Sequence, residues 1–86
     1  MTSKEFNEAL KAFRNHQLPM ELYIRIFVAC LINIKHRLGI DDKHFVPTHD
    51  ECVDVLDGLD RCRRGRLKRV VERIVVESTE PTARLQ

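Results

Sequence analysis

The densest group of ionisable side chains in the sequence is the stretch DRCRRGRLKR, residues 60–69. It holds six of the fifteen Lys and Arg residues of the chain, and its one acid stands at the first position. Guanidinium and ammonium groups bind carboxylates and phosphates through charge-assisted hydrogen bonds. The stretch therefore indicates contact either with the acidic surface of a protein or with a nucleic acid.

Metal binding and nucleophilic chemistry find less support. His49 and Cys52 lie three residues apart and would share one side of a helix, where both could bind zinc. Cys62 would lie about 15 Å farther along a continuous helix, too far for the same ion, so we expect no metal and no cofactor. Cys30 has no His nearby in the sequence, and we expect a buried, unreactive thiol. Since the chain lacks the phosphate-loop, GxSxG and HExxH motifs, we expect that it is not an enzyme.

Length and composition predict one small helical domain in the cytoplasm. A chain of 86 residues is close to the size at which a single core is thin. Three cysteines without short-range pairs do not predict a disulfide framework, and we see no secretory signal. The longest apolar run, LYIRIFVACLINI, is shorter than the roughly 20 residues of a membrane span, so we expect no membrane insertion. The net charge of +2 is too small to identify a nucleic-acid-binding protein.

Two helices are predicted in the first half of the chain. A capping box at the start, followed by apolar residues at every third or fourth position, predicts a helix over residues 3–15. Pro19 suits the start of a second helix and Gly39 the residue after its end, so this helix spans residues 19–38. Apolar residues surround most of its circumference, which predicts that it is buried on more than one side.

The second half begins with a loop over residues 39–47. Thr48 and Glu51 then match a second capping box, which predicts that a further helix begins at residue 49. Near the other end, the apolar period is lost after residue 77, and Pro81 follows. We therefore assign residues 1–77 to a single helical domain and residues 78–86 to a flexible tail.

Two interpretations of the third helical region are open. Gly65 could mark the turn of a helix-turn-helix with helices of about 49–61 and 66–77. Alternatively, one continuous helix spans residues 49–77, because the apolar residues before and after Gly65 keep the same helical phase. We favour the continuous helix, although Gly58 and Gly65 would each destabilise it by about 1 kcal/mol relative to Ala.

The favoured interpretation predicts an all-α homodimer of three-helix chains, arranged as a helical bundle. A continuous helix of about 43 Å would extend beyond the second helix of about 28 Å and leave apolar side chains uncovered. Residues 41–60 carry seven acids and one Lys, and residues 61–73 carry seven bases and one Glu, so two antiparallel copies would pair opposite charges. The predicted dimer interface comprises Leu67, Val70, Val71 and Ile74.

The basic residues divide between two sides of the continuous helix. Arg63 and Arg66 fall in its apolar sector, which predicts a structural role in ion pairs with the second copy. The residues predicted to bind a partner lie on the other side and are Arg61, Arg64, Lys68 and Arg69. A basic row of this kind is also common on helix surfaces that face solvent only.

These patterns lead to two hypotheses of function. The first is a small non-enzymatic regulatory or inhibitory protein that forms a homodimer and binds another protein with an acidic surface. The alternative is a small DNA- or RNA-binding protein that uses the basic residues between 61 and 69. Neighbouring acids weaken the alternative because they would repel phosphates; these are Asp50, Glu51, Asp54 and Asp57.

Overall fold

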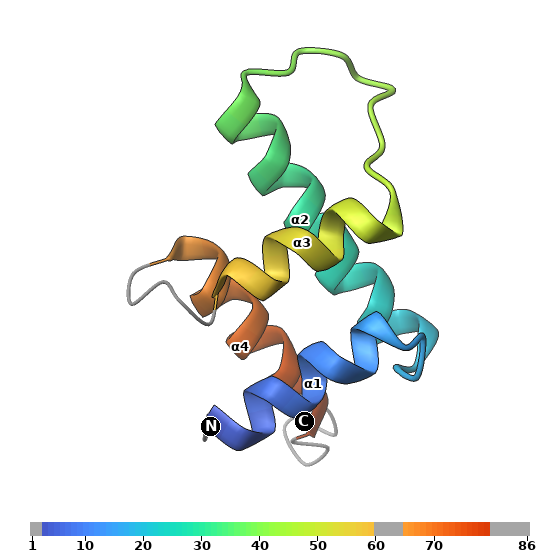
Figure 1. Ribbon diagram of the computed structural model, residues 1–86, viewed down its shortest axis with the longest axis vertical. Helices are drawn as coiled ribbons and strands as arrows, with labels where there is room; N and C mark the ends of the chain where they lie inside the picture. The colour runs from blue at the N-terminus through green and yellow to red at the C-terminus, as the bar shows by residue number, and fades with distance from the viewer. Residues whose placement is uncertain (1–2, 60–64, 80–86) are drawn as a thin grey trace, which may run out of the picture.

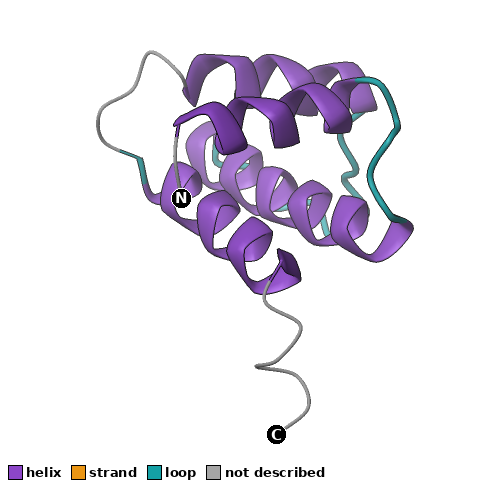
Figure 2. Ribbon diagram, turned by 90° about the horizontal axis from the view of Figure 1, so that it is seen from below, coloured by secondary structure: helices purple, strands orange, loops and turns teal. Residues whose placement is uncertain are grey.

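The computed structural model describes residues 3–59 and 65–79, which form four helices joined by loops (Figure 1). The helices are α1 (Ser3–Arg14), α2 (Met20–Leu38), α3 (His49–Leu59) and α4 (Arg66–Thr79). In two views at right angles, α1 and α3 form one layer and cross over a second layer made of α2 and α4 (Figures 1 and 2). The described part of the chain is therefore an all-α fold of two layers.

Local signals in the sequence set most of the helix ends. The bounds of α1 and α2 fall within one residue of the predicted ones. Gly39 has φ +64° and donates its backbone N–H to the carbonyl of Lys35, so the predicted glycine cap is confirmed. The second capping box is confirmed as well: the N–H of Thr48 donates to Glu51 Oε1 over 3.0 Å, and the N–H of Glu51 donates to Thr48 Oγ1 over 3.1 Å.

The prediction of one continuous helix over residues 49–77 is wrong. α3 ends at Leu59, and a separate helix begins at Arg66. Gly65 precedes the second helix, and its carbonyl accepts the first helical hydrogen bond there, from the N–H of Arg69 over 3.2 Å. The division corresponds to the interpretation in which Gly65 marks a turn, so each chain has four helices and not three.

The apolar residues of α3 and α4 have the same helical phase although the two helices are not continuous. Leu56 and Leu59 of α3 and Leu67 and Val71 of α4 belong to one buried cluster, so both helices turn their apolar sides to the same core. Burying an aliphatic side chain stabilises a fold by roughly 1.5–3 kcal/mol. A straight helix would lose several such contacts with α2, whereas ending it near two glycines costs little.

The predicted dimer interface is mostly inside the chain. Leu67, Val71 and Ile74 are 5%, 0% and 7% exposed because they pack against their own chain, whereas Val70 is 39% exposed. These residues were assigned to a dimer interface because they were expected at the uncovered end of a long helix. That long helix is absent, since α3 ends at Leu59 and α4 begins at Arg66. The predicted antiparallel pairing of residues 41–60 with residues 61–73 also required a continuous helix, which the structure does not have. A homodimer therefore stays a prediction, and its interface must lie on another surface.

Two further findings concern the ends and the length of the helices. α4 continues to Thr79, two residues past the predicted domain boundary, and residues 80–86 of the predicted tail lie outside the described residues. Among the helices of the described residues, none combines the length and the apolar character that a membrane crossing requires.

Two glycines give a matched test of the helix ends. Replacing Gly39 with Ala should lower the free energy of unfolding by about 1 kcal/mol, because a Cβ is strained at positive φ. Replacing Gly58 with Ala should raise the free energy of unfolding by about 0.5–1 kcal/mol, because Gly58 lies within α3 and has open space around it. Urea unfolding measures both changes, and two changes of the same sign would contradict the assigned conformations.

Candidate interaction surface

The outer side of α4 carries an exposed basic row, Arg66, Arg69 and Arg73, at positions i, i+3 and i+7. Within the described residues, none of the three forms an ion pair. Val70, which is 39% exposed, lies among them on the same helix. The row therefore offers three guanidinium groups to an anionic partner, next to an apolar side chain.

A shallow groove of about 230 Å³ lies between α2 and α4, beside the basic row. Its lining residues are Ala29, Ile32, Asn33 and His36 of α2 and Arg66, Leu67 and Val70 of α4. Ile32 is 62% exposed, so the groove has an open apolar edge as well as a basic one. Such a combination fits an amphipathic segment whose polar side is acidic.

The predicted partner-binding residues are only partly found on this surface. Arg61 and Arg64, together with Arg63, lie outside the described residues. Lys68 is half-buried, and its Nζ lies 5.7 Å from the centre of the Phe6 ring, so it contacts α1 of its own chain. Arg69 is exposed, as a partner-binding residue requires.

Arg66 and Arg73 change the sequence-based assignment. Arg66 was expected in a structural role inside the apolar sector, but it is exposed at the start of α4, because the sector was derived from a helix that does not continue. Arg73 was not predicted as a site residue. Its spacing from Arg66 is visible in the sequence, but Arg73 lies outside the dense basic stretch of residues 60–69.

α3 and α4, which lie in different layers (Figure 2), carry net charges of opposite sign. α3 carries four acids and no Lys or Arg, whereas α4 carries four bases and two acids. One ion pair fastens each layer internally: Arg14 pairs with Asp57 between α1 and α3, and Arg25 pairs with Glu77 between α2 and α4 over 3.3 Å. An anion can therefore approach α4 from the side away from the acids of α3.

His49 is held by contacts from three parts of the chain. Its Nδ1 lies 2.8 Å from the hydroxyl of Tyr23, and its Nε2 lies 3.1 Å from the backbone carbonyl of Arg14. Since a carbonyl only accepts, Nε2 carries a proton and Nδ1 accepts from Tyr23 in the neutral ring. The rings of Phe13 and His16 stack on it, with centroids 5.2 and 3.9 Å away. His49 is thus a structural link between α1, α2 and α3.

Neither His49 nor Cys52 is placed for zinc binding. Both ring nitrogens of His49 already have partners, and Cys52 has no exposed surface. Across residues 3–59 and 65–79, no three His, Cys, Asp or Glu side chains gather as metal ligands would.

Cys30 of α2 and Cys52 of α3 are both free, buried thiols, and they lie near enough to influence each other's pKa. Burial, with a smaller contribution from Cys52, raises the pKa of Cys30 to about 12, and burial also raises the pKa of Cys52. Both thiols are therefore protonated at neutral pH and poor nucleophiles. The expectation that Cys30 is buried is confirmed, whereas the sequence held no sign of its contact with Cys52.

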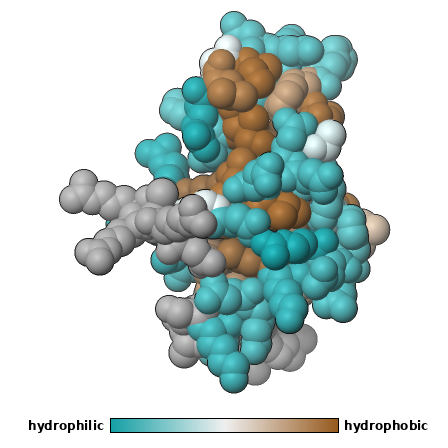
Figure 3. Space-filling view, in the orientation of Figure 1, coloured by the Kyte–Doolittle hydropathy of each residue, from teal (hydrophilic) through white to brown (hydrophobic). Residues whose placement is uncertain are grey.

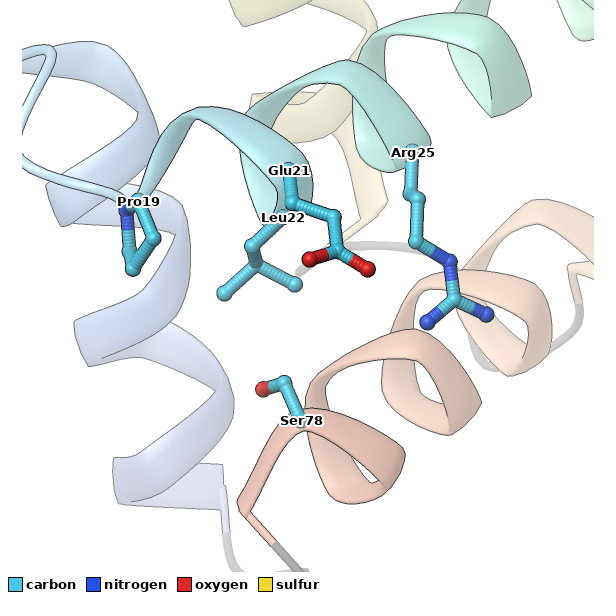
Figure 4. A pocket seen from close by; sticks show the side chains of 5 residues that line it. All are labelled: Pro19, Glu21, Leu22, Arg25 and Ser78. Carbon is cyan, nitrogen blue, oxygen red and sulfur yellow. The ribbon is translucent and has the colours of Figure 1, made fainter. Parts of the chain in front are cut away.

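A smaller hollow lies where the start of α2 meets the end of α4 (Figure 4). Glu21 and Arg25 extend into it from α2, and Ser78 comes from α4. The hydroxyl of Ser78 already donates to the carbonyl of Val75 over 2.8 Å, and Arg25 pairs with Glu77. With opposite charges side by side, this hollow offers no site that prefers one charge of ligand.

Apolar side chains also gather on the face shown in Figure 3, over the C-terminal half of α2 and the loop that follows it. Leu38 and Val46 are 69% and 65% exposed there. Ile40 and Phe45 are half-buried and Pro47 is buried. These three residues, and not the exposed Leu38 and Val46, therefore hold the loop to the helices.

Comparison with known proteins adds no assignment: no protein-family model, no curated protein and no solved structure matches the chain. The function must therefore be inferred from the basic row, the groove and the uncovered apolar residues.

The buried thiols predict a dependence of stability on pH. The folded chain keeps the proton of Cys30 to about pH 12, whereas the unfolded chain loses it near pH 9. The contribution of this thiol is thus complete below pH 9 and decreases as the pH rises above it. Between pH 8 and pH 10 the parent chain should lose about 1.4 kcal/mol more unfolding free energy than Cys30→Ala. Equal losses in urea titrations at the two pH values would show that Cys30 is not protected in this way.

Proposed function

We propose that the chain is a small non-enzymatic regulatory or inhibitory protein that forms a homodimer and binds another protein with an acidic surface. The observation that carries the proposal is the basic row on α4, Arg66, Arg69 and Arg73, beside the groove between α2 and α4. An acidic amphipathic segment could place its apolar side chains against Ala29 and Val70 of the groove and its carboxylates against the row.

The chemistry of the chain supports a binding role over catalysis. The candidates for proton transfer or nucleophilic attack that the sequence offered are occupied or protonated: His49 is hydrogen-bonded through both ring nitrogens, and the pKa of Cys30 is raised by burial. The groove, in contrast, is apolar and open, with charged groups at its edge. Charges at an edge act mainly on the rate of association and on the choice of partner.

Charge reversal on α4 tests the proposal. Capture of binding proteins from the native host should be compared for the parent chain, for Arg69→Glu with Arg73→Glu, and for a control, Lys4→Glu with Lys11→Glu. The control changes the charge equally at two exposed residues of α1. The α4 variant should bind the captured protein at least about tenfold more weakly, and the α1 variant should bind it like the parent. Equal effects of both variants, or a captured segment without acids, would contradict the proposal.

DNA or RNA binding is the alternative, and the separation of charges favours it more than the sequence did. The acids of α3 lie in the other layer, so they repel phosphates at α4 less than their nearness in the sequence implied. The same α4 variant tests this function by electrophoretic mobility shift on mixed-sequence DNA and RNA. Affinity should fall about 40-fold between 50 and 200 mM salt if each of the three arginines of the row binds one phosphate. No shift at 50 mM salt would exclude the alternative.

A further inference from the structure

One side of α2 is apolar and largely uncovered, although its edge borders the groove and the hollow shared with α4. Ile24, Val28 and Ile32 recur every four residues and are 50%, 42% and 62% exposed, and Met20, at 71%, begins the row. The opposite side of the same helix is fully buried at Ile26. α2 is therefore apolar on two sides, but its own chain covers only one, and uncovered rows of this kind mark interaction surfaces.

The residues on this outer side are arranged symmetrically about Val28. At about 100° per residue, Ile24 and Ile32 lie about 40° to either side of Val28 and about 6 Å from it along the axis. Glu21 and Lys35 lie about 20° to either side and about 10.5 Å along the axis. Each pair therefore has equal distances from Val28, and the outer pair has opposite charges.

We infer that α2 pairs with α2 of a second copy, close to antiparallel, across a two-fold axis beside Val28. This inference rests on the homodimer of the proposed function and assigns its interface. The two-fold axis brings Ile24 of each copy to Ile32 of the other, and Glu21 of each copy to Lys35 of the other. One apolar centre and two ion pairs then form from a single helix surface.

The charges favour a second copy over the acidic partner proposed for α4. A surface that receives an acidic segment needs bases at both ends, but Glu21 would repel such a segment at one end of the row. Opposite charges at equal distances from one residue complement a second copy turned by 180°. Within the described residues, neither Glu21 nor Lys35 forms an ion pair in the single chain. Glu21 is exposed at the edge of the row, beside Arg25, and Lys35 is half-buried.

Charge exchange on the full-length chain tests the pairing. Glu21→Lys places two bases opposite each other twice per dimer, and Lys35→Glu does the same with acids. Each single variant should raise the dimer dissociation constant at least about tenfold in sedimentation equilibrium, and the double variant should restore it to within about threefold of the parent. Lys11→Glu is the control, because Lys11 is exposed on α1, in the other layer, and should leave the dissociation constant unchanged.

The outcomes separate this inference from the proposed function. A parent chain that is monomeric at 100 µM overturns the inference and the proposed homodimer together, while binding through α4 is judged by its own variants. A parent dimer that ignores both single substitutions overturns the α2 interface and leaves the homodimer standing. Failure of the double variant to restore the dimer overturns the pairing of Glu21 with Lys35, provided that thermal melts show all variants folded.

Cross-linking tests the position of the axis without disturbing charge. Val28→Cys, in a chain with Cys62→Ser, should form a disulfide between copies within minutes of adding diamide, which accepts the two electrons and two protons that the thiols release. Val70→Cys in the same background is the matched control, because Val70 is 39% exposed and Val28 42%. Equal cross-linking of both variants, or none at residue 28, would overturn the axis beside Val28.

Discussion

Burial of one side of α2 is the constraint on which the rest of the fold depends. Ile26 and Cys30 have no exposed surface, and Ile34 is 6% exposed, although α2 is the longest described helix at 19 residues, or about 28 Å. α1, α3 and α4 are each shorter, at 12, 11 and 14 residues. No single one of them covers α2, so the chain reverses direction and places α3 and α4 against different parts of it. The same arrangement leaves the other side of α2 uncovered.

Local chemistry made most of the helix ends up to the start of α3 predictable. A glycine past a helix end and a reciprocal pair of Thr48 and Glu51 satisfy backbone groups within a few residues, and such signals act without knowledge of the rest of the chain. The break between α3 and α4 depends instead on how much apolar surface α2 offers. Helical phase does not carry that information, because two separate helices on one core show the same phase as one continuous helix.

The candidate site was predictable to the extent that it depends on composition along the chain. A basic row within residues 61–69 was expected in the middle of a continuous helix, and Arg69 belongs to the row that the structure shows. Its actual members followed only from the true start of α4, which exposes Arg66 and adds Arg73, whereas Lys68 turns towards Phe6. Contacts between distant residues, such as Tyr23 with His49, left no periodic pattern in the sequence because each rests on a single residue of each helix.

The separation of acids on α3 from bases on α4 has a consequence that the small net charge of +2 conceals. Among the described helices, α1 and α3 together carry six acids and three bases, and α2 and α4 carry seven bases and three acids. This distribution gives the described part of the chain an electric dipole moment from one layer to the other. In the field of a negatively charged partner, a diffusing molecule with such a moment turns before it makes contact, so a larger share of collisions begins with α4 in front. The turning acts over about one Debye length, roughly 8 Å at physiological ionic strength, and it weakens as salt is added. The arrangement of the helices therefore influences how the molecule is oriented when it meets a charged partner, in addition to which groups it presents to that partner.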